Sequence, residues 1–301
     1  MSVAAVSFAV NDRPGVGEAT RARILAAADD LGWEPSAPAR ALTDARARAV
    51  GLVLARDPGE LESDAFFARF VAGLERTLAP HDHALLLQLA PRADPRPYLR
   101  LAASRRVDGF VICDVARDDP RFAPLAAAGI AAVVAGHPGP DCPFPWLETR
   151  HGEGMALAAR HLVDRGHERI GFLGGPPELD YVQTRLERWR AALRDAGLPL
   201  GPVVCGGPPD ALAAAGVTAV AATSDVLASA VLAADPAIAV TGFDDSPLAV
   251  HGGLTSVRVD YAAFGAAAAA ALLATIAGEA VETPRLALPE LVVRASTAGG
   301  P

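Results

Sequence analysis

The sequence contains no lysine, only three cysteines and few aromatic residues. Cys113, Cys142 and Cys205 form no CxxC pair and are odd in number, which argues against a disulfide framework and a structural zinc site. An odd number of unpaired cysteines fits a reducing compartment, and we expect the three cysteine side chains to pack against their neighbours without a chemical role. Hydrophobic residues make up 51% of the chain and aromatic residues 5%, so alanine, valine and leucine must build most of the core.

The sequence also lacks a run suited to crossing a membrane. The one uncharged stretch near the required length, residues 261–278, is mostly alanine with glycine and threonine, and it is too weakly apolar. Met1 is not followed by the basic segment, apolar stretch and small-residue cleavage site of a secretory signal. We therefore expect a soluble, cytoplasmic protein with no membrane partner.

The formal net charge is -8, which by a simple charge rule argues against nucleic acid as a partner. The charge is unevenly distributed, however. Residues 1–50 carry six arginines and six acids, so the whole excess of negative charge belongs to the rest of the chain. Because lysine is absent, any charged side chain that contacts a phosphate must be an arginine.

Apolar strand-like runs alternate with helix-like segments from residue 49 onward. The stretch 161–176, HLVDRGHERIGFLGGP, is typical: a helix end, a Gly-His turn and a short apolar run that ends in two glycines. Such βα units require parallel sheets with helices on both faces, and 301 residues suffice for two lobes. We expect strands at 49–55, 83–89, 109–113, 131–135, 202–205, 219–222, 237–241 and 288–293, with a further strand in the stretch 161–176. We expect helices at 66–78, 97–103, 123–128, 153–164, 184–196 and 261–277, with a further helix that follows residue 222 and ends at 233.

The first 34 residues have a different character. Residues 1–10 and 18–31 are typical of two short helices, and the turn cluster NDRPG at 11–15 connects them. Two short helices with so little apolar surface make a poor core alone. Residues 35–43 could form a further short helix capped by Ser36, and 44–48 are charged and linker-like.

Several motifs, in this order, resemble the LacI/GalR family of bacterial transcription regulators over essentially the whole chain. They are VSFAVNDRPGVGEATRARILAAADDLGW at 6–33, PARAL at 38–42, VGLV at 50–53, DAFF at 64–67, VDGFVI at 107–112, the stretch 161–176, GFDD at 242–245, LTSVRVD at 254–260 and LPELVVRAST at 288–297. The resemblance implies a helix-turn-helix headpiece, a hinge helix and a two-lobed periplasmic-binding-protein-like core of parallel doubly wound sheets. That core would dimerise and bind a small effector in its cleft.

The resemblance also implies domain boundaries and DNA contacts. The headpiece would span 1–34, the hinge and linker 35–49, the first lobe 50–148 plus 260–278, the second lobe 149–259 plus 279–297, and a tail 298–301. Residues 1–10 match the recognition helix, whose first residues meet base edges in the major groove. The positions facing bases would be Val3, Ala4 and Phe8, with Ser7 and Asn11 nearer phosphate, and Leu42 would be the hinge wedge in the minor groove.

The largest departure from the family is at the front, where the first helix and the turn of the motif are absent. Met1 stands where the family usually has valine. We expect the native start to lie upstream, with a valine codon taken as the initiator. If the 301 residues are complete, specific DNA binding should be badly impaired, and the alternative function is an effector-binding sensor that no longer touches DNA.

The family match makes Arg185 a ligand-binding arginine, whereas a surface salt bridge among Glu187, Arg188 and Arg190 is the alternative. Asp244 follows a strand at the edge where α/β sheets bind ligands, but it could instead cap the next turn.

Ser224 stands where the family usually has asparagine and is a further effector-binding candidate, while we interpret Asp225 as a helix cap. Phe66 and Tyr261 match aromatic cleft positions, although either could belong to the core. Arg150 stands where the family commonly has aspartate, and Gly136 where some sugar-binding members have an acid, which argues against a simple sugar effector.

Enzyme signatures are missing. The sequence has no GxSxG elbow and no HExxH, and the Gly174-Gly175 pair lacks the Walker and GxGxxG patterns. His81 and His83 flank Asp82, but no third ligand has suitable spacing for a metal.

We therefore predict a cytoplasmic, homodimeric, ligand-responsive transcription regulator, most simply a repressor, that binds operator DNA and a sugar or related metabolite. We expect it to have no catalytic residue, cofactor or metal. An α/β enzyme is the least supported alternative.

Overall fold

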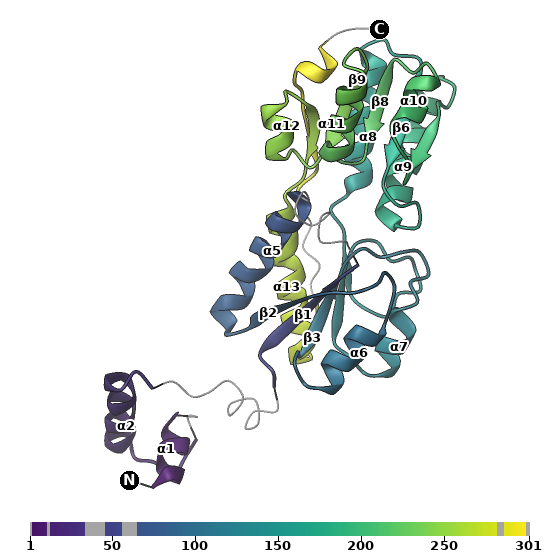
Figure 1. Ribbon diagram of the computed structural model, residues 1–301. Coiled ribbons are helices and arrows are strands. Elements are labelled where there is room, and N and C mark those ends of the chain that lie inside the picture. The colour runs from purple at the N-terminus through teal and green to yellow at the C-terminus, as the bar shows by residue number, and fades with distance from the viewer. Residues whose placement is uncertain (1, 11–12, 34–45, 56–64, 282–285, 299–301) are drawn as a thin grey trace. The chain divides into compact units, whose positions relative to one another are not determined.

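The computed structural model describes residues 2–10, 13–33, 46–55, 65–281 and 286–298, apart from the side chain of Ala213. Two compact units, Met1–Arg48 and Ala49–Pro301, make up the chain (Figure 1). Among the helices of the described ranges, none is long and apolar enough to cross a membrane.

The first unit contains helix α1 (Val3–Val10) and helix α2 (Glu18–Asp30), which pack against each other. Ala9 and Ile24 are its buried apolar residues. In the turn between the helices, Gly15 adopts a φ of +120°, and a Cβ there would lie 3.2 Å from the ring of Phe8. The turn therefore needs glycine at this position for both reasons.

The first sheet of the second unit has five strands in the order β2-β1-β3-β4-β5, all parallel. Their bounds are β1 Ala49–Leu54, β2 Ala84–Leu89, β3 Gly109–Ile112, β4 Ala132–Ala135 and β5 Trp146–Leu147. Strands β1, β3 and β4 are almost wholly buried, as expected of central parallel strands covered on both faces.

Helices cover both faces of this sheet. Helix α5 (Ala65–Leu78) and helix α13 (Tyr261–Ala277) pack on the face that contains Leu52 and Val111. Helix α6 (Arg96–Ala103) and helix α7 (Phe122–Ala127) pack on the opposite face. The single turn η1 (Ala79–His81) follows α5.

The second sheet has the order β11-β10-β9-β8-β6-β7, parallel except for the β10–β11 pair. The strands are β6 Ile170–Gly174, β7 Val203–Cys205, β8 Ala219–Ala222, β9 Ala239–Phe243, β10 Thr255–Arg258 and β11 Glu290–Val292. On one face lie α8 (His151–Asp164) and α9 (Asp180–Asp195), and on the other α10 (Asp210–Ala214), α11 (Asp225–Ala234) and α12 (Pro247–His251). The turn η2 (Ala295–Thr297) follows β11.

Helix α13 shows that the two lobes are interleaved in sequence. It comes directly after β10 of the second sheet, yet it packs on α5 and on strands β3 and β4 of the first sheet (Figure 1). The chain then returns to the second sheet as β11. The predicted α/β class with two doubly wound, parallel-dominated lobes is confirmed, whereas β5, α10, α12 and β10 are elements that the sequence pattern did not predict.

Candidate functional site

A cleft of about 290 Å³ opens where strands of both sheets end. Residues that follow β3, such as Cys113 and Val115, face residues that follow β8 and β9, such as Thr223 and Asp244. The carboxyl ends of parallel strands are the edge at which open α/β sheets bind ligands. The cleft has both apolar and polar walls, which suits a small organic molecule with a few polar groups.

All five residues predicted for the effector site line this one cleft, although they come from five separate segments of the chain. They are Phe66, Arg185, Ser224, Asp244 and Tyr261.

Arg185 lies on α9 and is only 6% exposed, so a surface salt bridge is the wrong interpretation of this residue. Its Nη1 donates a hydrogen bond to the carbonyl oxygen of Thr223 at 2.6 Å, and its guanidinium carbon lies 3.6 Å from the centre of the Phe243 ring. Its Nε is buried and has no hydrogen-bond partner among the described residues. Arg185 is thus held by a carbonyl oxygen and an aromatic ring, and its Nε remains as a donor for a ligand.

Tyr261, Asp244 and Phe66 form a connected set on one wall. The Tyr261 hydroxyl donates to Asp244 Oδ1 at 2.7 Å, and the Tyr261 ring packs edge-on to Phe66 with centroids 4.9 Å apart. Burial and the nearby Asp244 carboxylate raise the pKa of the Tyr261 hydroxyl well above its usual value, so it remains a donor. Asp244 does not cap α12, because Ser246 does.

Ser224 and Asp225, at the start of α11, have hydrogen bonds that differ from those suggested by the sequence. Ser224 is the N-cap of α11, since its side chain accepts from Leu227 N at 3.2 Å. The cap interpretation of Asp225 is therefore wrong. Its carboxylate accepts instead from Ser246 N at 2.7 Å and from the Ser256 hydroxyl at 2.5 Å, and burial raises its pKa.

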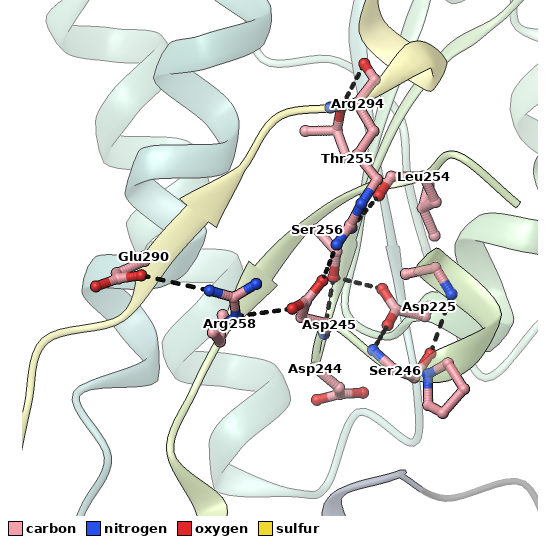
Figure 2. A network of polar contacts seen from close by, with 12 residues as sticks. Asp225, Asp244, Asp245, Ser246, Leu254, Thr255, Ser256, Arg258, Glu290 and Arg294 are labelled. Atoms are coloured by element: carbon pink, nitrogen blue, oxygen red, sulfur yellow. Dashed lines mark hydrogen bonds and ion pairs between the residues drawn. The ribbon is translucent and has the colours of Figure 1, made fainter. Parts of the chain in front are cut away.

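Figure 2 shows the hydrogen bonds and ion pairs that hold the turn after β9 in place. Asp245 accepts hydrogen bonds from Arg258 at 2.7 Å and from Arg294 at 2.6 Å, and its backbone N donates to Ser256 Oγ at 3.0 Å. Burial alone would raise the pKa of Asp245, but these two arginines outweigh it and lower the pKa. The turn that presents Asp244 is thus built on a stable ionised carboxylate.

Reasoning from the sequence missed His151, the first residue of α8. Its side chain lines the cleft, is 6% exposed, and has an Nδ1 with no hydrogen-bond partner among the described residues. Burial, followed by the positive charge of Arg185 and the neighbouring His137, lowers the pKa of His151 to about 3. A lone histidine carries no motif, so no sequence signal could have identified it.

The two positions at which the sequence departs from the family occupy different places. Gly136 lines the cleft with a φ of +149° and lies against Val115, so a side chain there would be strained. Arg150 is the N-cap residue of α8 and pairs with Glu153 at 3.1 Å, and it is not among the cleft residues.

On one rim of the cleft the lobes contact each other directly. Arg117 pairs with Asp180 at 3.2 Å and with Glu187 at 2.9 Å. Beside this pair, Ala116 and Leu179 form an antiparallel bridge. These contacts join the lobes next to Asp180, which lines the cleft.

The predicted DNA contacts lie on the first unit. Val3, Ala4, Ser7 and Phe8 are all exposed and recur at helical spacing, so they share one face of α1. Asn11 and Leu42, the other two predicted contacts, lie outside the described residues.

Two family models match the second unit. The model described as "Periplasmic binding proteins and sugar binding domain of LacI family" matches residues 47–205, and "Periplasmic binding protein-like domain" matches residues 159–297. Together they span both lobes.

Similar proteins are named as transcription regulators. The HTH-type transcriptional regulator AglR of Rhizobium meliloti (strain 1021) is 35% identical over 66% of this chain and 56% of its own length, so the match spans little more than half of that relative. The HTH-type transcriptional regulator MalR of Streptomyces coelicolor is 33% identical over 100% of this chain and 94% of its own length. Among solved structures, a transcriptional regulator CelR-cellobiose complex has a TM-score of 0.74 and 28% identity, and the match covers 98% of this chain and 96% of that one.

Proposed function

Because the chain belongs to the LacI/GalR family of transcription regulators, we propose that it is a ligand-responsive, DNA-binding regulator, most simply a repressor. A small-molecule effector would bind in the cleft between its lobes and shift their relative position, and with it the spacing of two hinge helices in a dimer. This requires the effector to prefer one arrangement of the lobes. The observation that carries the proposal is the convergence of Phe66, Arg185, Asp244 and Tyr261 on one cleft.

A hydroxylated metabolite such as a sugar suits this cleft best, and the departure from the family at Arg150 does not argue against a sugar, because Arg150 is not among the cleft residues. Arg185 offers guanidinium donors, and Asp244 offers a carboxylate, while Phe66 and Tyr261 supply an aromatic wall. A structural relative is described as a complex with cellobiose, which makes cellobiose the first probe to use. His151, which is neutral at physiological pH, adds a hydrogen-bond donor or acceptor to the cleft.

The first unit would contact operator DNA. The exposed face of α1 with Val3, Ala4 and Phe8 could meet thymine methyl groups, and Ser7 could reach a phosphate. We assign the headpiece to 1–34, the hinge and linker to 35–49, and the lobes to 50–148 plus 260–278 and 149–259 plus 279–297.

A homodimer would use exposed apolar side chains of the second unit. Leu248 and Val250 on α12 are 46% and 54% exposed. On edge strand β2, Leu87 and Leu89 are 45% and 39% exposed. Exposed apolar side chains that form a contiguous patch favour a protein partner.

The effector site is tested by thermal unfolding with cellobiose and a panel of related sugars. Each bound sugar should stabilise the parent by about 2.7 kcal/mol at a hundredfold excess over its Kd. Arg185→Ala should weaken binding by about 10- to 100-fold, because charge-assisted hydrogen bonds are lost. Arg194→Ala, at an exposed position of the same helix, is the matched control. Equal responses of the two variants would refute the role of Arg185.

DNA binding separates the proposal from the alternative of a sensor without DNA. The protein should shift DNA that flanks its own gene, with affinity falling steeply as salt rises. If it does not shift this DNA, the sensor alternative is favoured. Turnover of a metabolite in place of stabilisation would instead support an enzyme.

A further inference from the structure

Arg69 connects the two lobes at the back of the cleft. It lies on α5 of the first lobe, three residues after Phe66. Its Nη1 donates to the carbonyl oxygen of Asp244 at 2.8 Å, and its Nη2 donates to the carbonyl oxygen of Asp245 at 2.9 Å. Both acceptors belong to the turn that follows β9 in the second lobe.

The backbone of that turn is unusual. Asp244 and Asp245 have φ values of 103° and 46°, and neither is a glycine. L-residues adopt positive φ at a cost, which rises when two occur in succession, so neighbouring groups must hold the turn in this conformation. In this conformation two successive carbonyl oxygens point toward the first lobe. The rigid guanidinium of Arg69 donates one hydrogen bond to each of them.

The same contacts lead back to the ligand site. The side chain of Asp244 accepts from Tyr261, the Tyr261 ring packs on Phe66, and Phe66 lies on the same helix as Arg69. Helices α5 and α13 approach closely, because Gly73 of α5 lies against the Ala262 carbonyl and Gly265 of α13 lies against the Phe70 carbonyl. The two helices therefore move together, and the aromatic wall and Arg69 move with them.

We propose that Arg69 is a positioning residue that holds the Asp244–Asp245 turn in its left-handed conformation and ties the direction of the Asp244 carboxylate to the relative position of the lobes. Arg69 is not among the cleft residues, so it acts through Asp244 and does not touch the ligand. The role of Arg69 in the response to an effector rests on the proposed function. Its role in holding the two lobes together is independent of that function, and this role can be measured without an effector.

Cys113 provides the measurement, because this thiol lines the cleft and is only 2% exposed. With Cys142→Ser and Cys205→Ser, it is the single cysteine of the chain. Its rate of alkylation by iodoacetamide then reports opening of the lobes. Arg69→Ala should raise that rate by about tenfold or more, since two charge-assisted hydrogen bonds across the lobes are lost.

Three comparisons make the test decisive. Arg76→Ala should leave the rate unchanged. Arg76 is exposed on the same helix, and its described hydrogen bond goes to the carbonyl oxygen of Ala72, on that helix, at 3.3 Å. Arg69→Lys, which cannot span both carbonyls, should fall between alanine and the parent. The series is repeated with Arg117→Ala, which removes the ion pairs to Asp180 and Glu187 between the lobes, so that these contacts cannot mask the effect.

Two results would overturn the proposal. One is an alkylation rate for Arg69→Ala within twofold of that for Arg76→Ala in both backgrounds. The other is a rise that merely follows the loss of global stability measured by urea unfolding, which would make Arg69 a general structural residue. Failure to find a sugar that binds would overturn the proposed effector and leave the alkylation result standing.

Discussion

Arg185 and His151 form an unusual pair of buried basic residues at the centre of the cleft. Each is 6% exposed, and each has one nitrogen without a hydrogen-bond partner among the described residues. A buried guanidinium without a carboxylate is tolerated here because a carbonyl oxygen and two aromatic rings face it. The neighbouring His151 is neutral at physiological pH, because burial and the positive charge of Arg185 lower its pKa.

The neutral state of His151 predicts a dependence of stability on pH. The unfolded histidine gains a proton near pH 6.5, whereas the folded one does so only at about 3, so the free energy of unfolding should fall as pH decreases between these values. The contribution of this one group should reach a few kcal/mol at the acid end. Urea unfolding of the parent and of His151→Gln between pH 7 and pH 4 measures it.

His151→Gln should flatten this part of the profile because glutamine does not titrate. His251→Gln, at an exposed position, should leave the profile unchanged. Parallel profiles for the parent and His151→Gln would show that His151 does not remain neutral in the folded state.

At the scale of elements, the α5–α13 pair determines where the cleft wall lies. Backbone contact between the helices requires glycine at Gly73 and Gly265, since a Cβ at either position would overlap a carbonyl of the opposite helix. Glycine in the middle of a helix costs about 1 kcal/mol relative to alanine. Here close packing outweighs that cost.

Gly265→Val should therefore destabilise the chain by about 3 kcal/mol, at the upper end of ordinary overpacking, because both obstacles are backbone atoms. The matched substitution Ala270→Val, at an exposed site on the same helix, should cost less than about 1 kcal/mol. Chemical unfolding of both variants gives the comparison. A Gly265→Val variant as stable as Ala270→Val would mean that the helices can separate freely.

The strands and long helices were largely predictable because their period and burial are local properties. Strand β1 and helices α8 and α13 were predicted within about two residues, as such patterns allow. The short elements β5, α10, α12 and β10 were not predicted. Strand β10 is four residues long and is defined by its pairing with β9 and β11, and α12 is a five-residue helix that begins at a Ser-Pro cap.

At the scale of the whole molecule, the proposed homodimer depends on apolar side chains that a single copy leaves exposed. Leu248→Glu would place a charge in such an interface and should raise the dimer dissociation constant by at least about tenfold. Leu200→Glu is the control, since Leu200 is similarly exposed at 49% and lies beyond the end of α9. Sedimentation equilibrium measures both, and equal constants would exclude α12 from the dimer interface.

The sequence by itself determined the α/β class, the alternation of elements and the residue types of the cleft, because hydrophobic period and motif order are local properties of the chain. It could also single out Arg185, Asp244 and Tyr261, but it left open a surface salt bridge for Arg185, a turn cap for Asp244 and a core position for Tyr261. Only the tertiary structure excluded the surface salt bridge, by burying Arg185, and showed Tyr261 hydrogen-bonded to Asp244. His151 and Arg69 emerged from the structure alone, because their roles depend on partners that are 34 and 175 residues away in the chain, and no local pattern records such contacts.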